Sequence, residues 1–270
     1  QSPLTTSMRP EHYHVTFRDL APLSSATQRV GLDGRADSLA RLPFSLAVTT
    51  AGGATSQWAR TMVFTPCSSA ARQITVDGNL EEWNDWPIVI NGVSGARNPP
   101  TGADVDDPAD ISAVAALQWD ETHLFLAVKA TDDVHHNTRR DGSLWDGDSI
   151  QLAITPLPGV PSAPAAEFTL ALGADGTQFW ANRNFQGQPT GILKLPAAVV
   201  RKGSETAYEV AIPWSALPGC SPVEGTWFGL GLVLNEDDGK GRGWIGWHNG
   251  IAADKNPAAY GQVTLVKRPR

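Results

Sequence analysis

Hydrophobic and polar residues alternate in short runs along most of the chain. The runs Ile111–Trp119 and His123–Ala130 flank a turn at Asp120 to Thr122 and predict a hairpin. No segment keeps a 3.6-residue apolar period over three helical turns. Many short strands separated by turn residues are typical of a β-sandwich, so we predict an all-β protein, with a jelly roll as one arrangement. The other predicted elements are strands at Ser149–Thr155, Glu167–Leu172, Gln178–Ala181, Tyr208–Pro213, Phe228–Leu234, Trp244–His248 and Gln262–Val266, and a helical turn at Trp214–Leu217.

The first seventy residues have a different texture. They contain three predicted strands, His12–Phe17, Ser45–Thr50 and Trp58–Phe64, followed by a linker-like stretch at Pro66–Ala71. We therefore predict two parts: a strand-rich N-terminal segment at 1–70 and a β-sandwich at 71–270. The segment is either the remainder of a preceding β-sandwich or a piece that packs against the main domain.

Charge and composition exclude some partners. The 270 residues carry a formal net charge of −7, which disfavours nucleic acid because phosphate binding needs clustered Lys and Arg. No apolar stretch approaches the roughly 20 residues that span a bilayer, so we expect no membrane partner. Ten Trp against three Tyr is an unusual ratio, and indole rings are well suited to stacking on flat apolar surfaces.

Cys67 and Cys220 are the two cysteines. In a cytosolic protein they would be buried thiols. In a secreted protein a single bridge would close about 150 residues and stabilise the fold by roughly 4–5 kcal/mol in the chain-entropy model. We expect the bridge.

Several motifs follow one another in an order that resembles a known family. The family is that of the family 9 carbohydrate-binding modules, within the wider DOMON-like group, and the match covers about residues 72–268. The motifs are Ile74–Trp86, the hairpin from Ile111 to Asp133, Leu144–Thr155, Tyr208–Leu217, Leu230–Trp247 and Ala258–Leu265.

The resemblance implies both a fold and a function. It implies a β-sandwich that binds an oligo- or polysaccharide, often at a chain end, between two facing Trp side chains. It also implies structural calcium in some members, and attachment to a catalytic domain on the same parent chain that digests polysaccharide. Such a protein would be secreted, into the extracellular space or the periplasm.

Trp145 and Trp247 match the two family Trp by position. Trp145 lies in a loop just before a predicted strand, where a ring can be presented to solvent. On a strand Trp244 and Trp247 face opposite ways, so one is expected in the core and the other free to stack. Gln151 stands where the family often carries an acidic residue, so a charged sugar contact is lost.

Further candidates surround these residues. Asn182 and Arg183 offer donors for adjacent hydroxyls, and Trp180 offers a third stacking surface; a solvated hairpin end is the alternative for this stretch. His248 follows Trp247 and is either a ligand contact or a rim residue.

Clustered acidic residues suggest where calcium would bind. Asp104, Asp106 and Asp107 lie in one irregular stretch, and calcium takes six to eight oxygen ligands, although an acidic surface loop is the alternative. The pairs His12 with His14 and His135 with His136 are weaker metal candidates, the second being expected in a solvated loop.

Two other function classes remain open at this stage. A catalytic glycan-cleaving domain, hydrolase or lyase, would need paired acid and base groups, and no such constellation or known catalytic motif stands out. A structural spacer would have the same fold with no ligand. A haem protein is disfavoured because the only methionines, Met8 and Met62, lie outside the matched region.

Overall fold

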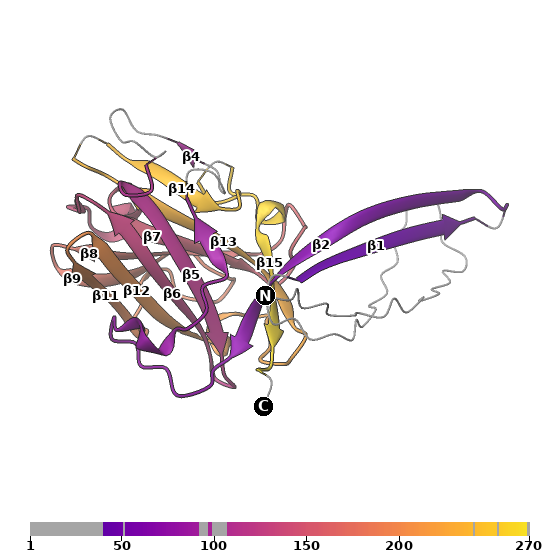
Figure 1. Ribbon diagram of the computed structural model, residues 1–270, viewed down its shortest axis with the longest axis horizontal. Coiled ribbons are helices and arrows are strands. Elements are labelled where there is room, and N and C mark those ends of the chain that lie inside the picture. Colours follow the sequence, from indigo (N-terminus) through magenta and orange to yellow (C-terminus); the bar gives the residue numbers. More distant parts are fainter. Residues whose placement is uncertain are drawn as a thin grey trace, which may run out of the picture.

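A computed structural model of the protein describes residues 40–50, 52–91, 97–98, 107–239, 241–252 and 254–268. The all-β prediction is confirmed: these residues form strands joined by turns and short 3-10 helices (Figure 1). None of the helices in the described part is long or apolar enough to cross a membrane. The strands are β1 (Ala40–Thr49), β2 (Thr55–Ser69), β3 (Ile88–Ile90), β4 (Arg97–Asn98), β5 (Ile111–Trp119), β6 (His123–Asp132), β7 (Ser149–Thr155), β8 (Ala166–Gly173), β9 (Gly176–Arg183), β10 (Gly191–Ile192), β11 (Ala197–Lys202), β12 (Glu205–Pro213), β13 (Trp227–Glu236), β14 (Gly243–Trp247) and β15 (Gly261–Val266); the 3-10 helices are η1 (Leu80–Glu82), η2 (Asp141–Asp146), η3 (Trp214–Ala216) and η4 (Pro257–Ala259).

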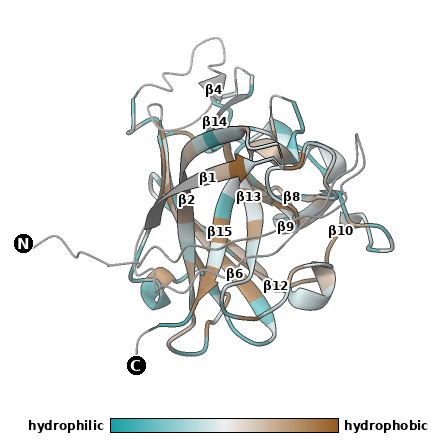
Figure 2. Ribbon diagram, turned by 90° about the vertical axis from the view of Figure 1, so that its right-hand side faces the viewer, coloured by the Kyte–Doolittle hydropathy of each residue, from teal (hydrophilic) through white to brown (hydrophobic). Residues whose placement is uncertain are grey.

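One strongly curled sheet supplies both layers of the fold. Its strands follow the order β10-β9-β8-β7-β13-β15-β2-β5-β6-β12-β11, and β14 pairs with β13 at one side. The sheet curls until β11, at one end, lies against β8 and β9 near the other end. The inner faces of the two halves enclose the main core, which includes Val199, Tyr208 and the tilted ring pair of Phe168 and Phe179, with centroids 5.4 Å apart. Figure 2 shows apolar residues along the central strands, such as β13, β15 and β6.

The predicted linker at Pro66–Ala71 is wrong, because β2 continues through it. Residues Thr65 to Ser68 pair in parallel with β15, and Ser68 and Ser69 pair with β5. Pro and Ser signalled a turn, but Cys67 is fully buried in the main core and secures the strand there. The part of β2 from Thr55 to Phe64 pairs with β1 in a long hairpin that projects from the body of the protein (Figure 1).

The expected disulfide is not formed. Cys67 and Cys220 are both free, and both are buried among the apolar side chains of the main core. Each thiol fills core volume as a small apolar group, so neither needs the other as a partner. Burial raises the pKa of the Cys67 thiol and raises that of Cys220 to about 12.

The outer face of β5, β6 and β12 is closed by the chain segment before β5. Trp83 from this segment packs on Ala116, Phe125, Ala127 and Ala211. Its indole N–H donates to Glu209 Oε1 at 2.7 Å, while the backbone N–H groups of Asp77 and Gly78 donate to Oε2. This half of the sheet is therefore covered on both faces, and its buried carboxylate is fully paired by the chain itself.

Candidate functional site

The outer face of the other half of the sheet carries a set of polar side chains beside a buried apolar cluster that includes Ala153, Val233 and Trp244. In the register, Gln151 of β7 lies opposite Thr169 of β8 and Val233 of β13, and Asn235 lies opposite Ser149. Directly opposed residues share a face, so these polar side chains form one surface. Their neighbours along the strands, such as Ile150, point into the main core instead. The polar members of this outer face are Ser149, Gln151, Glu167, Thr169 and Asn235, each no more than 4 % exposed.

A hydrogen-bond network joins these side chains. The Gln151 amide donates to Glu167 Oε1 at 3.1 Å, and its oxygen accepts from Arg242 Nη2 at 3.3 Å. Arg242 Nε also donates to Asn235 Oδ1 at 2.9 Å, and Lys255 forms an ion pair with Glu167. Burial lowers the pKa of Arg242 to about 10, so the guanidinium stays charged at neutral pH. The face thus offers donors and acceptors in fixed positions, which recognition of hydroxyl groups requires.

Aromatic rings stand around this polar face. Trp145, in η2, is 36 % exposed, and the Arg242 guanidinium lies 4.9 Å from its ring centroid. Trp180 of β9 lies opposite Thr169 and is half-buried. Trp244 of β14 lies opposite Asn235 but is only 8 % exposed. Of the three, Trp145 presents the most ring surface to solvent.

Trp247 does not share the polar face. It lies opposite Leu232 in the β13–β14 register and packs against the main core. Its ring meets His248 edge-on at 4.5 Å and approaches Gly261, where any Cβ would lie 2.5 Å from the indole. Trp244 and Trp247 do face opposite ways as predicted, but the register puts Trp244 on the polar side. Among the described residues no ring contact joins Trp145 to Trp247.

The remaining predicted sugar residues divide into two groups. Asn182 joins the polar face, since its Oδ1 accepts from the Thr169 hydroxyl at 2.7 Å. Arg183 lies opposite Glu167, and its Nε and Nη2 are buried without a hydrogen-bond partner. His248 is exposed at the end of β14, with a positive φ of 63°, beside Trp247 and away from this network.

The sequence analysis missed five contributors: Glu167, Thr169, Asn235, Arg242 and Lys255. One signal was available for three of them. In strands that pack an apolar core on one side, polar residues at alternate positions mark the opposite face. Glu167 and Thr169 occupy such positions in β8, and Asn235 follows the apolar run of β13. Arg242 and Lys255 lie in loops, where no such signal exists.

A group of carboxylates gathers where β5 begins and where β6 and β13 end. Asp110, Asp133 and Asp238 each place one carboxylate oxygen within 4.8 Å of the others. Glu236 is 1 % exposed, and neither of its carboxylate oxygens has a hydrogen-bond partner. Burial, together with the charges of Asp238 and Asp110, raises the pKa of Glu236 to about 8.

Of the three residues predicted for calcium, Asp107 lies in the described part of the chain, and it is not a member of this carboxylate group. Asp104 and Asp106 lie outside the described residues. Asp107 is exposed, and its carboxylate accepts the backbone N–H of Ala109 in the turn that leads into β5. Asp110, from the same acidic stretch, does belong to the group. His12 and His14 also lie outside the described residues.

A second group combines two carboxylates with an imidazole. Asp132, His135 and Asp148 place one ligand atom each within 4.8 Å of the others. Burial raises the pKa of Asp132 to about 6, against the pull of Arg201, and raises that of Asp148 to about 8. His135 is thus half-buried in a polar cluster rather than part of a solvated loop.

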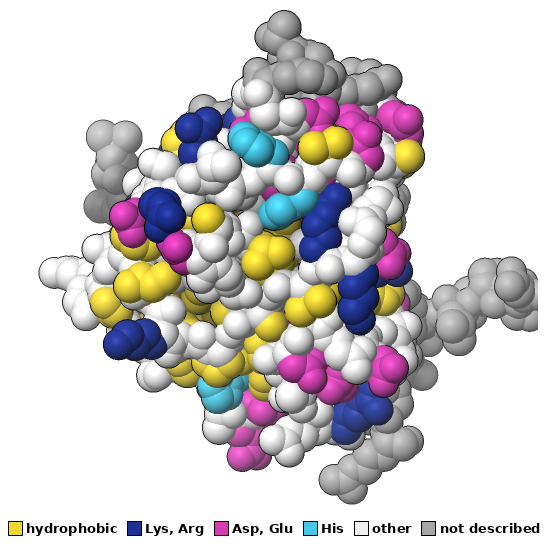
Figure 3. Space-filling model, turned by 90° about the vertical axis from the view of Figure 1, so that its left-hand side faces the viewer, with side chains coloured by type: hydrophobic (Ala, Val, Ile, Leu, Met, Phe, Trp, Pro, Cys, Tyr) yellow, Lys and Arg dark blue, Asp and Glu magenta, His cyan; other side chains and the backbone are white. Residues whose placement is uncertain are grey.

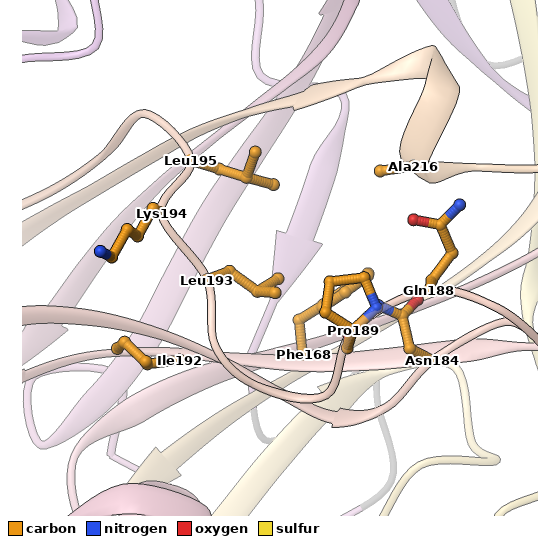
Figure 4. A pocket seen from close by; sticks show the side chains of 9 residues that line it. All are labelled: Phe168, Asn184, Gln188, Pro189, Ile192, Leu193, Lys194, Leu195 and Ala216. Carbon is orange, nitrogen blue, oxygen red and sulfur yellow. The ribbon is translucent and has the colours of Figure 1, made fainter.

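One further opening lies beside β10. It is a pocket of about 200 Å³, lined by Phe168, Asn184, Gln188, Pro189, Ile192, Leu193, Lys194, Leu195 and Ala216 (Figure 4). Its lining is mostly aliphatic, and the amide of Asn184 is already bonded to the Pro189 carbonyl oxygen. On the left-hand side of the molecule in Figure 1, hydrophobic side chains lie beside Lys, Arg and His (Figure 3). The polar face, rather than this pocket, combines rings with paired polar groups.

Comparison with known proteins gives one family and several related folds. The family described as carbohydrate family 9 binding domain-like matches residues 76–268. Two solved structures of a family 9 carbohydrate binding module from Caldicellulosiruptor kristjanssonii are similar in fold. The one in complex with glucose has a TM-score of 0.56 at 15% identity, over 76% of this chain and 97% of that one. The one in complex with cellotriose has a TM-score of 0.57 at 16% identity, over 76% and 95%. No curated protein matches the sequence.

Proposed function

Because the chain belongs to the carbohydrate family 9 binding domain-like family, we propose that it binds a glucose-containing oligosaccharide on its polar face. The observation that carries this proposal is the combination of the exposed Trp145 ring with the network of Gln151, Glu167, Asn235 and Arg242. A pyranose needs an apolar platform for its C–H face and fixed polar groups for its hydroxyls. The similar modules from C. kristjanssonii were solved with glucose and cellotriose, which makes these sugars the first ligands to try.

In this proposal Trp145 is the platform and Arg242 its movable partner. Arg242 lies over one side of the indole, so a sugar stacks either on the other side or after the guanidinium moves aside. Trp180, Asn182 and Arg183 border the face from β9 and extend the site. Trp247 and His248 are not part of it, since Trp247 lies on the core side of β14.

The test is a calorimetric titration with glucose and cellotriose. We expect Trp145→Ala to weaken cellotriose binding roughly tenfold or more, about 1.4 kcal/mol. Trp58→Ala is the matched control, because Trp58 is 47 % exposed but lies on the projecting hairpin. Equal losses in both variants, or no loss in either, would rule out the platform.

We further propose that the carboxylate group binds calcium. Asp110, Asp133, Asp238 and Glu236 supply oxygen donors of the kind that calcium prefers. The two oxygens of Glu236 support this assignment, because a buried carboxylate without partners is costly unless a cation or a proton compensates it. The ion would supply no chemistry beyond fixing the ends of three strands. Calorimetry should show calcium binding that Glu236→Gln abolishes and that the exposed control Glu224→Gln retains.

These proposals describe a non-catalytic accessory role. The module would hold an attached polysaccharide-degrading enzyme on its glycan, in a secreted protein. Binding without release of reducing sugar from cellotriose would support this role, and turnover by the purified chain would replace it with a glycan-cleaving function.

A further inference from the structure

His135 has a fixed tautomer. Its Nε2 lies 3.0 Å from the carbonyl oxygen of Leu172. A carbonyl oxygen can only accept, so Nε2 carries the proton in this contact. In the neutral ring Nδ1 then presents a lone pair, and it faces into the loop between β6 and β7.

No donor among the described residues forms a hydrogen bond with Nδ1. Asp148 Oδ2 lies 3.4 Å from Nδ1, too long for a normal hydrogen bond, and Nδ1 is buried. Asp132 brings a second carboxylate oxygen within 4.8 Å of both atoms. Asp148 is 2 % exposed and Asp132 is 7 % exposed, so solvent screens this crowding poorly.

The geometry is that of a partly built transition-metal site. Nitrogen and oxygen ligands bonded at about 2.0–2.1 Å in a tetrahedron lie roughly 3.3–3.4 Å apart, as Nδ1 and Asp148 Oδ2 do. The surrounding contacts are those that orient metal ligands: the imidazole donates its other N–H to a backbone carbonyl, and the carboxylates accept bonds of their own. Asp148 accepts from the backbone N–H groups of His136 and Asp237, and Asp132 accepts from that of Val134.

We propose that His135, Asp132 and Asp148 bind a divalent transition-metal ion of the zinc class, separate from the calcium group. An imidazole nitrogen with two carboxylates suits zinc or cobalt, whereas calcium takes oxygen ligands. Arg201 pairs with Asp132 Oδ2 at 3.0 Å and leaves that carboxylate free electron pairs for an ion. A bound ion would tie the loop after β6 to the start of β7.

Cobalt is the probe, because tetrahedral cobalt coordinated by nitrogen and oxygen absorbs visible light and calcium does not. The untagged full chain is titrated with cobalt chloride in excess calcium, and zinc chloride is then added to displace the cobalt. We expect a visible band from one bound cobalt per chain that zinc removes. His135→Ala should weaken zinc binding at least tenfold, since even outer-shell changes cost about 10–100-fold.

His136→Ala is the matched control: this neighbouring imidazole contacts Asp237 instead, so the band should persist. His135→Gln guards against a folding defect, because it keeps an amide donor for Leu172 but offers no imidazole, and it should also lose the band. A second control, His12→Ala with His14→Ala, should keep it. The proposal is overturned if the wild type gives no band, or if the band survives in His135→Gln. Sugar binding is measured separately, so failure here leaves the polar face untouched.

Discussion

Two glutamates, Glu209 and Glu236, are equally buried but differ in their hydrogen-bond partners. Each is 1 % exposed. Glu209, under the covering segment of β5, β6 and β12, accepts bonds from Trp83, Gly78 and Asp77. Glu236, at the end of β13, accepts none and faces the charges of Asp110 and Asp238. Glu209 is satisfied by the chain itself, whereas Glu236 needs a proton or, as we propose, a calcium ion to offset its burial.

The largest expected effect is the pH dependence of stability without calcium. The pKa of Glu236 in the folded protein is about 8, above its ordinary 4.5, so the folded state holds a proton that the unfolded state has lost. In EDTA, stability should therefore fall as pH rises from about 5 to 8, by up to about 1.4 kcal/mol per pH unit and group. Thermal unfolding at several pH values measures this slope.

Glu236→Gln should flatten that slope in part, since Asp148 titrates in the same direction. Calcium at pH 8 should raise the melting temperature of the wild type and leave that of Glu236→Gln unchanged. Two results would contradict the proposed role of Glu236. One is a stability in EDTA that rises with pH, and the other is an equal effect of calcium on the melting temperatures of the wild type and Glu236→Gln.

Glu209→Gln, in contrast, should lower the stability of the fold. The amide of Glu209→Gln keeps one acceptor oxygen, so either Trp83 or the backbone N–H groups lose their acceptor. An unsatisfied buried donor costs about 1–3 kcal/mol, which urea unfolding would detect. Glu205→Gln, exposed on the same strand, should stay within about 0.5 kcal/mol of the wild type. A neutral Glu209→Gln would mean that the covering segment does not depend on this carboxylate.

The alternation of apolar and polar residues predicted the strands well, but it could not predict which side chains from different strands lie close together. The patterns at Ile111–Trp119 and Ser149–Thr155 match β5 and β7 to the residue, because an apolar core on one side imposes a period of two. β11 was missed: its run Ala197–Lys202 ends in charged residues and is mostly half-buried, so its alternation is weak.

The candidate site depends on register, which the sequence does not state. That Trp244 and Trp247 diverge follows from one strand, but which of them joins Gln151 depends on the pairing of β14 with β13. The carboxylate group draws Asp110, Asp133 and Asp238 from three distant stretches, so no local spacing marks it. The acidic run before β5 was visible, yet of its two described members Asp110 belongs to the group and Asp107 does not.

A smaller effect should follow from placing a carboxylate inside the polar network. Gln151→Glu replaces the amide that donates to Glu167 at 3.1 Å and sets two carboxylates side by side. Such a pair raises the pKa of one member, so the variant should lose about 1 kcal/mol at pH 8 and recover as pH falls toward 5. Gln57→Glu, exposed on the hairpin, makes the same charge change and should show no such recovery. Equal pH profiles for the two variants would mean that Arg242 and Lys255 absorb the new charge.

The smallest expected effect concerns buried groups that need no partner. A thiol is a weak donor, so Cys67 and Cys220 sit in the core without the cost that an unpaired carboxylate carries. A reductant should therefore change the melting temperature by less than the roughly 2–4 °C that 1 kcal/mol produces in a domain of this size. Because burial raises the pKa of both thiols, neither should react with a thiol reagent until the chain is unfolded, when two should react. A bridge closing about 150 residues would instead contribute roughly 4–5 kcal/mol, so a large drop in melting temperature on reduction would show that the two cysteines are joined after all.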